Sequence, residues 1–265
     1  MPATTINEVI STLETIINDS VAQNSRLGYF ASLYYKVTVS VRDGIAKGQF
    51  QNGQRMEKLD VIFANRYLTA YEQWGNGQTP DHSWLIAFQM AQKASPLVLQ
   101  HLLLGMNAHI NLDLGIAAVE VSGTEPLEDL HNDFNMINTI ISSLTYQVLA
   151  ELGRVSPLLS LLGLHAGNNN SVLIQFSIDN ARDGAWCYAE ELYALPPANR
   201  EAYIKDRDQN IFKLGENLAV QTGFLKFTIW LIHLLEWKKP SAIIDVLHST
   251  TKRHFTVDKT KSSKI

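Results

Sequence analysis

Apolar residues recur at helical spacing along most of the chain. In residues 6–21 they fall three and four positions apart, and Thr5 with Glu8 forms a capping box at the start. The stretch YYKVTVSV alternates like a strand, but the pattern around it and Gly48 beyond it favour one long helix. The segments GQRMEKLDVIFANRYLTAYEQW, DHSWLIAFQMAQKA, LEDLHNDFNMINTIISSLTYQVLAELG and SVLIQFSIDNARDGAWCYAEELYAL show the same spacing. The sequence predicts an all-α fold, a single-domain multi-helix bundle.

The most apolar segment is predicted to be a long central buried helix at about 96–121. Ser95 and Pro96 are typical of a helix start, and leucine, isoleucine and alanine occupy nearly every direction around the axis. A second apolar stretch, GFLKFTIWLIHLLEW, is interrupted by Lys226 and His233 and is shorter than a membrane span requires. We expect that stretch to lie in a core, and we expect no transmembrane segment.

Composition narrows the class of protein. The chain has 265 residues, of which 46% are hydrophobic and 18% charged, which is typical of a folded globular protein. We expect one helical domain at 1–249 and a flexible C-terminal tail at 250–265, which is polar and basic.

A net charge of -4 with no other basic stretch argues against nucleic acid as a partner. Cys187, the single cysteine, excludes an internal disulfide. The N-terminus resembles neither a signal nor a transit peptide, so we expect a cytoplasmic protein.

The central helix carries polar residues where apolar ones are expected. At about 100° per residue, His101, Gly105, His109 and Asp113 fall on one face. An uncompensated buried carboxylate is costly, and two imidazoles beside it are typical ligands of a divalent cation. We therefore predict metal ligation by His101, His109 and Asp113. The alternative is a satisfied polar layer, in which the histidines donate to backbone carbonyls and Asp113 meets an arginine.

Other polar residues inside apolar patterns are candidates for the same site. Asp60 and Asp133 are predicted as further metal ligands from neighbouring helices. Arg66 is predicted either to bind an anionic substrate or to pair with a buried carboxylate. Tyr67 and His131 are predicted to transfer protons.

These same stretches resemble a known family. QHLLLGMNAHINLDLGIAA, with MEKLDVIFANRYLTAY and DFNMIN, is similar to an uncharacterised, mainly bacterial family catalogued only as a domain of unknown function. The resemblance covers about 30–230 and implies a shared fold with no established activity. A looser likeness links Leu104, Gly105, His109 and Asp113 to the helical zinc-dependent phospholipase C and nuclease group, and it implies phosphodiester hydrolysis by analogy. The later HxxxE ligand pair of that group has no counterpart here.

Three functions follow from the sequence. The first is a metal-dependent enzyme, a hydrolase that uses a divalent metal ion, zinc or iron, on a small-molecule or lipid-like substrate in a helical-bundle pocket. The second is a non-haem iron oxidoreductase, although the paired Glu-x-x-His motifs of di-iron proteins are missing. The third is a non-enzymatic helical binding or scaffold protein. The oligomeric state stays open.

Overall fold

The computed structural model of the protein describes residues 2–167 and 171–249. Over these residues the chain forms helices and no strand, which confirms the all-α class. The predicted tail, 250–265, lies outside the described residues. The α-helices are α1 (Ile6–Ala22), α2 (Gly28–Ala46), α3 (Gly53–Gly75), α4 (His82–Ala91), α5 (Val98–Ala108), α6 (Gly115–Ser122), α7 (His131–Val155), α8 (Val172–Gln175), α9 (Ile178–Ala194), α10 (Pro197–Ala219), α11 (Gly223–Leu235) and α12 (Pro240–His248). A π-helix, η1 (His109–Leu114), and two 3₁₀-helices, η2 (Leu127–Leu130) and η3 (Leu159–His165), complete the described helices.

The strand-like stretch YYKVTVSV lies inside α2 and is helical. Its alternation misleads because polar residues of this helix are buried as well as apolar ones. Thr38 is fully buried, and the buried Lys36 ammonium lies 2.5 Å from the Glu151 carboxylate of α7. A helix enclosed on several sides has no single polar face, so its helical period is hidden in the sequence.

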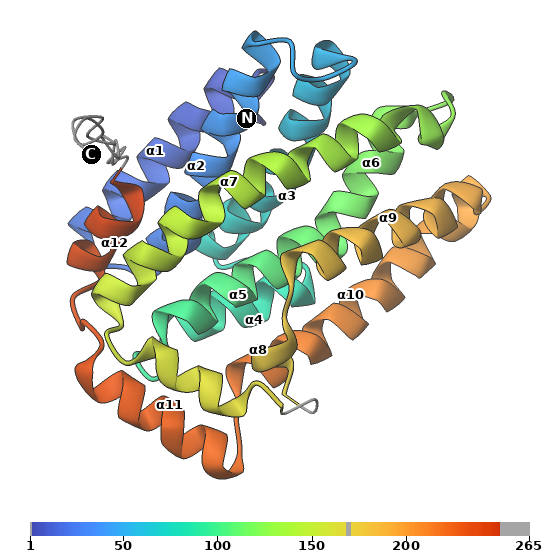
Figure 1. Ribbon diagram of the computed structural model, residues 1–265. Helices are drawn as coiled ribbons and strands as arrows, with labels where there is room; N and C mark the ends of the chain where they lie inside the picture. The colour runs from blue at the N-terminus through green and yellow to red at the C-terminus, as the bar shows by residue number, and fades with distance from the viewer. Residues whose placement is uncertain (1, 168–170, 250–265) are drawn as a thin grey trace, which may run out of the picture.

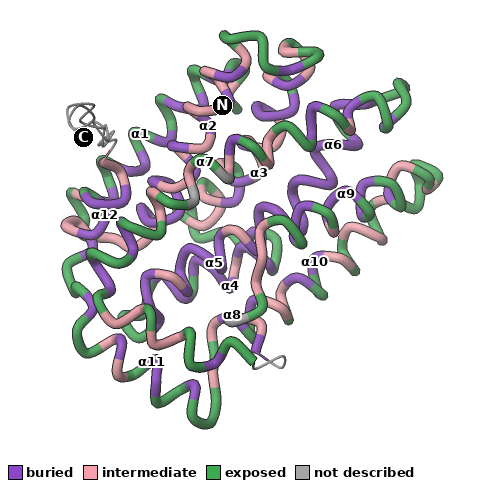
Figure 2. Tube along the Cα trace, viewed as in Figure 1, coloured by how far each residue is buried: buried purple, intermediate pink, exposed green. Residues whose placement is uncertain are grey.

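The central helix is continuous through α5, η1 and α6 (Figure 1). α2, α4 and α10 pack against α5, whereas α3 and α9 pack against α6, and α7 crosses over the front of the bundle. Burial colouring shows the central helix enclosed along its length (Figure 2). This confirms the predicted long buried helix, which starts at Val98 rather than at Pro96. The Val98 amide donates to Glu236 Oε1 at 3.1 Å, so a carboxylate from beyond α11 caps the helix start.

Val98–Ser122 is also long and apolar enough to cross a membrane by length and composition, with a mean hydropathy of 1.4. Of its most apolar window, 89% is buried inside the fold, which is the environment of a core helix. Two further helix pairs qualify only if each is taken as one span, across bends of 108° and 67°. The expectation that no segment spans a membrane stays a prediction.

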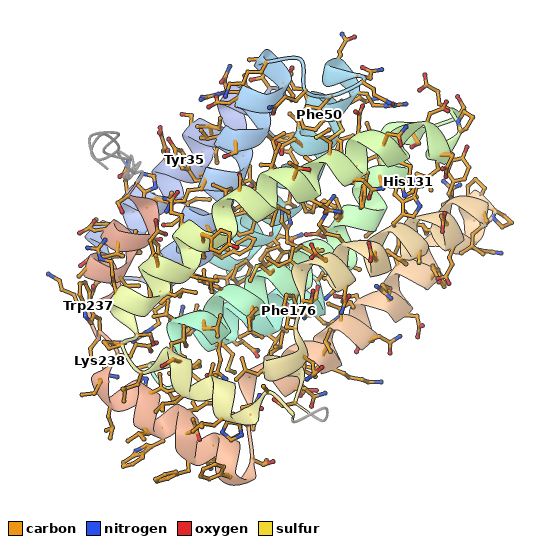
Figure 3. The ribbon with its side chains drawn as sticks, in the orientation of Figure 1. Tyr35, Phe50, His131, Phe176, Trp237 and Lys238 are labelled. Carbon is orange, nitrogen blue, oxygen red and sulfur yellow. The ribbon has the colours of Figure 1, made fainter. Side chains whose placement is uncertain are left out.

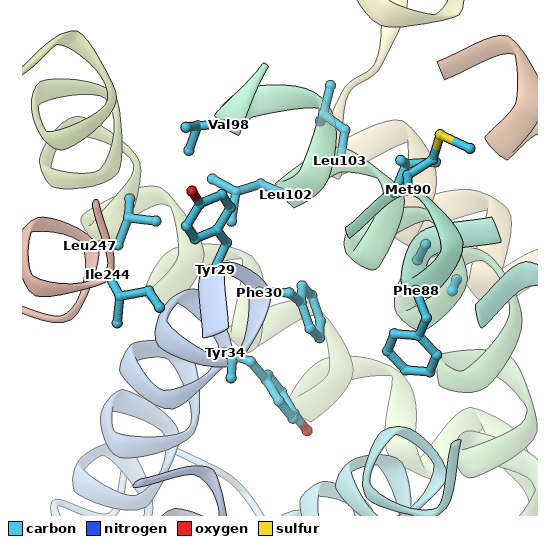
Figure 4. Close-up of a cluster of buried hydrophobic side chains, with 14 of the residues drawn as sticks. Tyr29, Phe30, Tyr34, Phe88, Met90, Val98, Leu102, Leu103, Ile244 and Leu247 are labelled. Carbon is cyan, nitrogen blue, oxygen red and sulfur yellow. The ribbon is translucent and has the colours of Figure 1, made fainter. Parts of the chain in front are cut away.

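Two apolar clusters flank the central helix. One joins α1, α2, α3, α4, α5 and α12, and the close-up in Figure 4 shows Tyr29, Phe30 and Leu102 of this cluster packed together. The other joins α3, α6, α7 and α9. Gly105 allows the first cluster to close, because a Cβ atom there would lie 2.4 Å from Cδ2 of Phe30. The space beside Gly105 is therefore occupied by an aromatic ring.

Candidate functional site

His109 and Asp113 lie together inside the π-helix. His109 Nδ1 is 3.3 Å from Asp113 Oδ2, the contact expected of residues four apart. Arg66 Nε of α3 donates to Asp113 Oδ1 at 2.7 Å, and Trp84 Nε1 of α4 donates to Oδ2 at 2.8 Å. Three donors from three helices therefore satisfy this buried carboxylate. π-Helical turns are rare and occur frequently at functional sites.

The surroundings of His109 determine its charge and which ring nitrogen carries the proton. Burial lowers the pKa of this imidazole, and the attraction of Asp113 offsets that effect only in part, so the ring is neutral. Its Nδ1–H donates to Asp113, which leaves the lone pair of Nε2 as an acceptor. Burial alone would lower the pKa of Arg66, but the Asp113 carboxylate raises it, and the guanidinium stays charged.

A cavity of about 260 Å³ lies beside His109 and beneath α7. It suits a small or slender ligand, since pockets for drug-sized ligands measure about 300–1,000 Å³. Its lining on α7 runs from Phe134 to Leu152, about 27 Å of helix at about 1.5 Å per residue. The remaining wall comes largely from α2, α3, α5 and η1, and it is mostly apolar: Phe30, Leu33, Val37, Val41, Met56, Leu59, Phe63, Leu99, Leu102, Leu103, Met106, Ile110 and Leu114.

Three side chains on this wall each carry a buried polar atom that makes no hydrogen bond of ordinary geometry within the described part of the chain. The atoms are Tyr34 Oη, Asp60 Oδ2 and His109 Nε2, contributed by α2, α3 and η1. The Tyr34 and His109 rings meet edge to face with their centroids 4.4 Å apart. We call these three residues the polar cluster.

Burial raises the pKa of the two acidic groups in the polar cluster, Asp60 and Tyr34. It raises the pKa of Asp60 from 3.8 to about 7, with the nearby Glu57 carboxylate adding to the rise. Burial also raises the pKa of Tyr34 well above its usual value, the charge of Asp60 contributes, and the nearby Thr38 hydroxyl opposes this rise only in part. The Tyr34 phenol is therefore a permanent donor, whereas Asp60 exchanges its proton near neutrality.

Arg182 of α9 contributes a second polar group to the cavity wall. Its guanidinium donates to Asn138 Oδ1 and to the Phe134 carbonyl, and it lies over the Phe134 ring at 4.4 Å. Among the described residues no carboxylate lies within ion-pair distance of it. Burial lowers its pKa to about 10, against the attraction of Asp179 and Asp183, so the buried group stays a cation.

His101 does not join His109. Eight residues separate them along the helix, a rise of about 12 Å, so one ion cannot contact both even when both lie on one face. His101 instead meets Tyr29 edge to face at 5.7 Å. Burial lowers the pKa of its imidazole to about 3, and the Pro96 carbonyl does not offset that effect.

Asp133 and His131 lie at the start of α7 and serve local contacts. Both oxygens of Asp133 accept backbone N–H groups, from Gln51 at 2.6 Å and Asn52 at 2.9 Å, and so hold the turn before α3. His131 stacks on Trp186 at 4.5 Å. Figure 3 shows His131 towards one end of α7, away from Phe176, which lines the cavity.

Tyr67 belongs to the aromatic shell around His109, with ring centroids 6.3 Å apart. Burial raises the pKa of its phenol, so the hydroxyl keeps its proton.

The five predicted ligands therefore do not form one metal site. Over residues 2–167 and 171–249, no three His, Cys, Asp or Glu side chains come together in a way that would hold an ion. The alternative predicted for Asp113, a pairing with an arginine, is the arrangement in the structure, and the arginine is Arg66. Among the described residues no ligand set for zinc or iron is assembled, and metal binding stays a prediction.

Sequence reasoning did not select Tyr34, Trp84 or Arg182. Tyr34 and Trp84 look like ordinary core aromatics, and Arg182 lies between Asp179 and Asp183 in a segment that is typical of a solvated face. Lys36 with Glu151 shows the same difficulty, because the partners of these groups lie far away in sequence.

The fold and the site define an all-α protein with an apolar cavity that carries a buried polar cluster. A family model described as a family of unknown function (DUF5995) matches residues 6–221, and the chain belongs to that family. No curated protein and no solved structure matches the chain. The looser likeness to zinc-dependent phospholipase C proteins stays a prediction.

Proposed function

We propose that the protein binds a slender, lipid-like small molecule in the cavity beneath α7. The observation that carries the proposal is the placement of the polar cluster on an otherwise apolar wall. Each buried polar atom without a partner costs about 1–3 kcal/mol. A ligand that forms hydrogen bonds with these atoms would remove that cost.

The cluster fits a hydroxyl or carbonyl group. The Tyr34 phenol donates to either oxygen, and the neutral His109 Nε2 accepts from a hydroxyl. The hydrocarbon part of the ligand would leave water at about 25 cal/mol for each Å² buried. Arg182 adds a preference for an acidic group, because a carboxylate would pair with a buried cation that has no such partner.

A second candidate function is proton transfer to or from the bound molecule. Its support is the orientation of His109, whose Nδ1 is held by Asp113, whereas Nε2 is buried without a hydrogen bond on a side chain that belongs to the cavity wall. A neutral imidazole oriented by a carboxylate is suited to act as a general base. Asp60, with a pKa of about 7, is suited to exchange a proton with the same molecule. This arrangement favours an enzyme acting on a lipid-like substrate.

The metal-dependent hydrolase and the non-haem iron oxidoreductase stay predictions without a supporting ligand set. Elemental analysis of the purified protein beside a His109→Ala variant tests them. A stoichiometric metal that is lost in the variant would favour them over a ligand site without metal.

Displacement of a fluorescent long-chain polyene acid tests the binding proposal. Oleic acid, oleyl alcohol and oleylamine serve as competitors of equal chain length. Leu144→Trp, which fills the cavity from α7, should weaken probe binding at least about tenfold, because overpacking displaces the ligand. Tyr146→Trp is the matched control, since Tyr146 is exposed on the same helix. The absence of binding for every chain, or equal effects of both variants, would contradict the proposal.

Two variants distinguish the contribution of Arg182 from that of the polar cluster. Arg182→Gln should reduce the preference for oleic acid over oleyl alcohol, whereas His109→Gln should weaken alcohol binding. Proton transfer is tested by deuterium incorporation from D₂O into molecules extracted from the protein. Incorporation that depends on His109 supports the second function, and its absence with bound ligand present leaves only binding.

A further inference from the structure

α11 presents large apolar side chains to solvent. Phe224, Phe227 and Trp230 are each more than half exposed, and their rings stack in succession at 6.4 and 5.7 Å. Leu234 and Leu235 continue the exposed surface, and Trp237 lies just beyond the helix beside Lys238 (Figure 3). We call these six apolar residues the α11 face. Contiguous apolar patches of this kind mark sites that meet another surface.

The α11 helix is apolar on two sides. At about 100° per residue, the buried residues Leu225, Ile229 and Ile232 fall on one side, and Phe227, Trp230 and Leu234 of the α11 face fall roughly opposite. The expectation that this stretch belongs in the core is therefore wrong for half of the helix. A core helix that needed only one apolar side would carry polar residues on the other.

The charges beside the α11 face have one sign. Lys226, Lys238 and Lys239 are exposed, and Glu236 is the only acidic residue between 220 and 239. Glu236 is buried, where it accepts hydrogen bonds from the Val98 amide and from Ser156 Oγ at 2.5 Å. The exposed charged side chains of this segment are therefore all cationic.

We propose that α11 docks on an anionic lipid membrane. Phenylalanine, tryptophan and leucine would enter the boundary between headgroups and acyl chains, and the lysines would contact lipid phosphates. Tryptophan is enriched at such boundaries. A second copy of the chain fits less well, because a two-fold interface over this face would bring like-charged lysines together without a carboxylate to pair them.

The position of α11 also relates it to the cavity. The Trp237 amide donates to the Val155 carbonyl at 2.9 Å, which ties the segment after α11 to the end of α7. The cavity-lining residues Leu149 and Leu152 lie in the last turns of that helix, and Leu149 is more than half exposed. Docking would place this end of the cavity near the lipids. The docking proposal itself does not depend on what the cavity binds.

Co-sedimentation with lipid vesicles tests the proposal with the full chain. Vesicles of phosphatidylcholine alone are compared with vesicles that also contain phosphatidylglycerol. We expect binding to the anionic vesicles that weakens as salt rises. The pair Lys226→Gln and Lys238→Gln should weaken binding roughly 25-fold, at about fivefold for each lysine. Lys58→Gln with Lys93→Gln removes two exposed lysines elsewhere and should change nothing.

Phe227→Ser with Trp230→Ser should abolish binding to the anionic vesicles, whereas Tyr146→Ser, which changes another exposed aromatic residue, should not. Far-UV circular dichroism confirms that each variant is folded. Failure of the wild type to bind anionic vesicles would overturn the proposal, as would equal effects of the two lysine pairs. A concentration-dependent dimer that Phe227→Ser and Trp230→Ser abolish, without vesicle binding, would assign the α11 face to self-association instead.

Discussion

The ion pairs of Arg66 allow a direct test of how Asp113 stabilises the protein. The same guanidinium contacts two carboxylates, Asp113 at 2.7 Å and Asp81 at 3.3 Å. Asp113 is fully enclosed and also accepts from Trp84 and His109, whereas half of the Asp81 side chain is exposed. Asp113→Asn keeps the shape of the side chain but removes its charge. It also places an amide NH₂ group, which is a donor, against N–H groups that need an acceptor. Breaking a buried pair in this way costs about 3–5 kcal/mol.

Asp81→Asn is the matched control, because an exposed ion pair contributes only about 0–1 kcal/mol. The free energy of unfolding is measured by urea denaturation, followed by far-UV circular dichroism, for the wild type and both variants. Since small domains are stable by only about 5–15 kcal/mol, the Asp113 variant should unfold at much lower urea. If the two variants lose the same stability, the enclosed network around Asp113 does not hold the fold together, and our account of it is wrong.

Three further predictions concern buried groups. Because folding raises the pKa of Asp60 from 3.8 to about 7, its native state binds the proton more tightly, and stability falls as pH rises through that window. Asp60→Asn should remove that fall and raise the unfolding free energy at pH 8 by up to about 4 kcal/mol, as urea titrations across pH would show. His101→Phe should stabilise the protein by about 1–3 kcal/mol. The gain should grow as pH falls from 6.5 towards 3, since the native imidazole resists protonation, and an unchanged acid-unfolding midpoint would refute this. Gly115→Ala should lower the free energy of unfolding by about 1–3 kcal/mol, because its Cβ would lie 2.5 Å from Tyr188 and 2.9 Å from a backbone oxygen. Gly153→Ala is the control: its Cβ would lie in open space, and the substitution should stabilise the protein by up to about 1 kcal/mol in thermal unfolding.

The sequence predicts the helices well because their apolar spacing is local. It also predicts the contact of His109 with Asp113, since residues four apart meet on any helix. The pairing of Asp113 with Arg66 appears in the sequence only as an alternative, because nothing local indicates that α3 approaches η1. The separation of His101 from His109 follows from helical rise alone, which a comparison of angles around the axis ignores.

The cavity and the α11 face are not predictable from local pattern. The cavity exists because α7 crosses over several helices that are distant in sequence, and Tyr34, Asp60 and Arg182 become a site only through that crossing. The α11 sequence shows two apolar sides, but apolar residues alone do not reveal which side meets protein and which meets solvent.

The π-helix also sets how the second half of the central helix is oriented. A π turn holds one more residue than an α turn, so every side chain after Leu114 is rotated by roughly 100° from the direction that an unbroken α-helix would give it. That rotation aims the bare side of Gly115 at Ala185 and Tyr188 of α9. Deleting a single residue between 109 and 114 would restore α-helical winding and turn that side away from α9. The extra residue in this one turn therefore determines whether the central helix packs closely against α9.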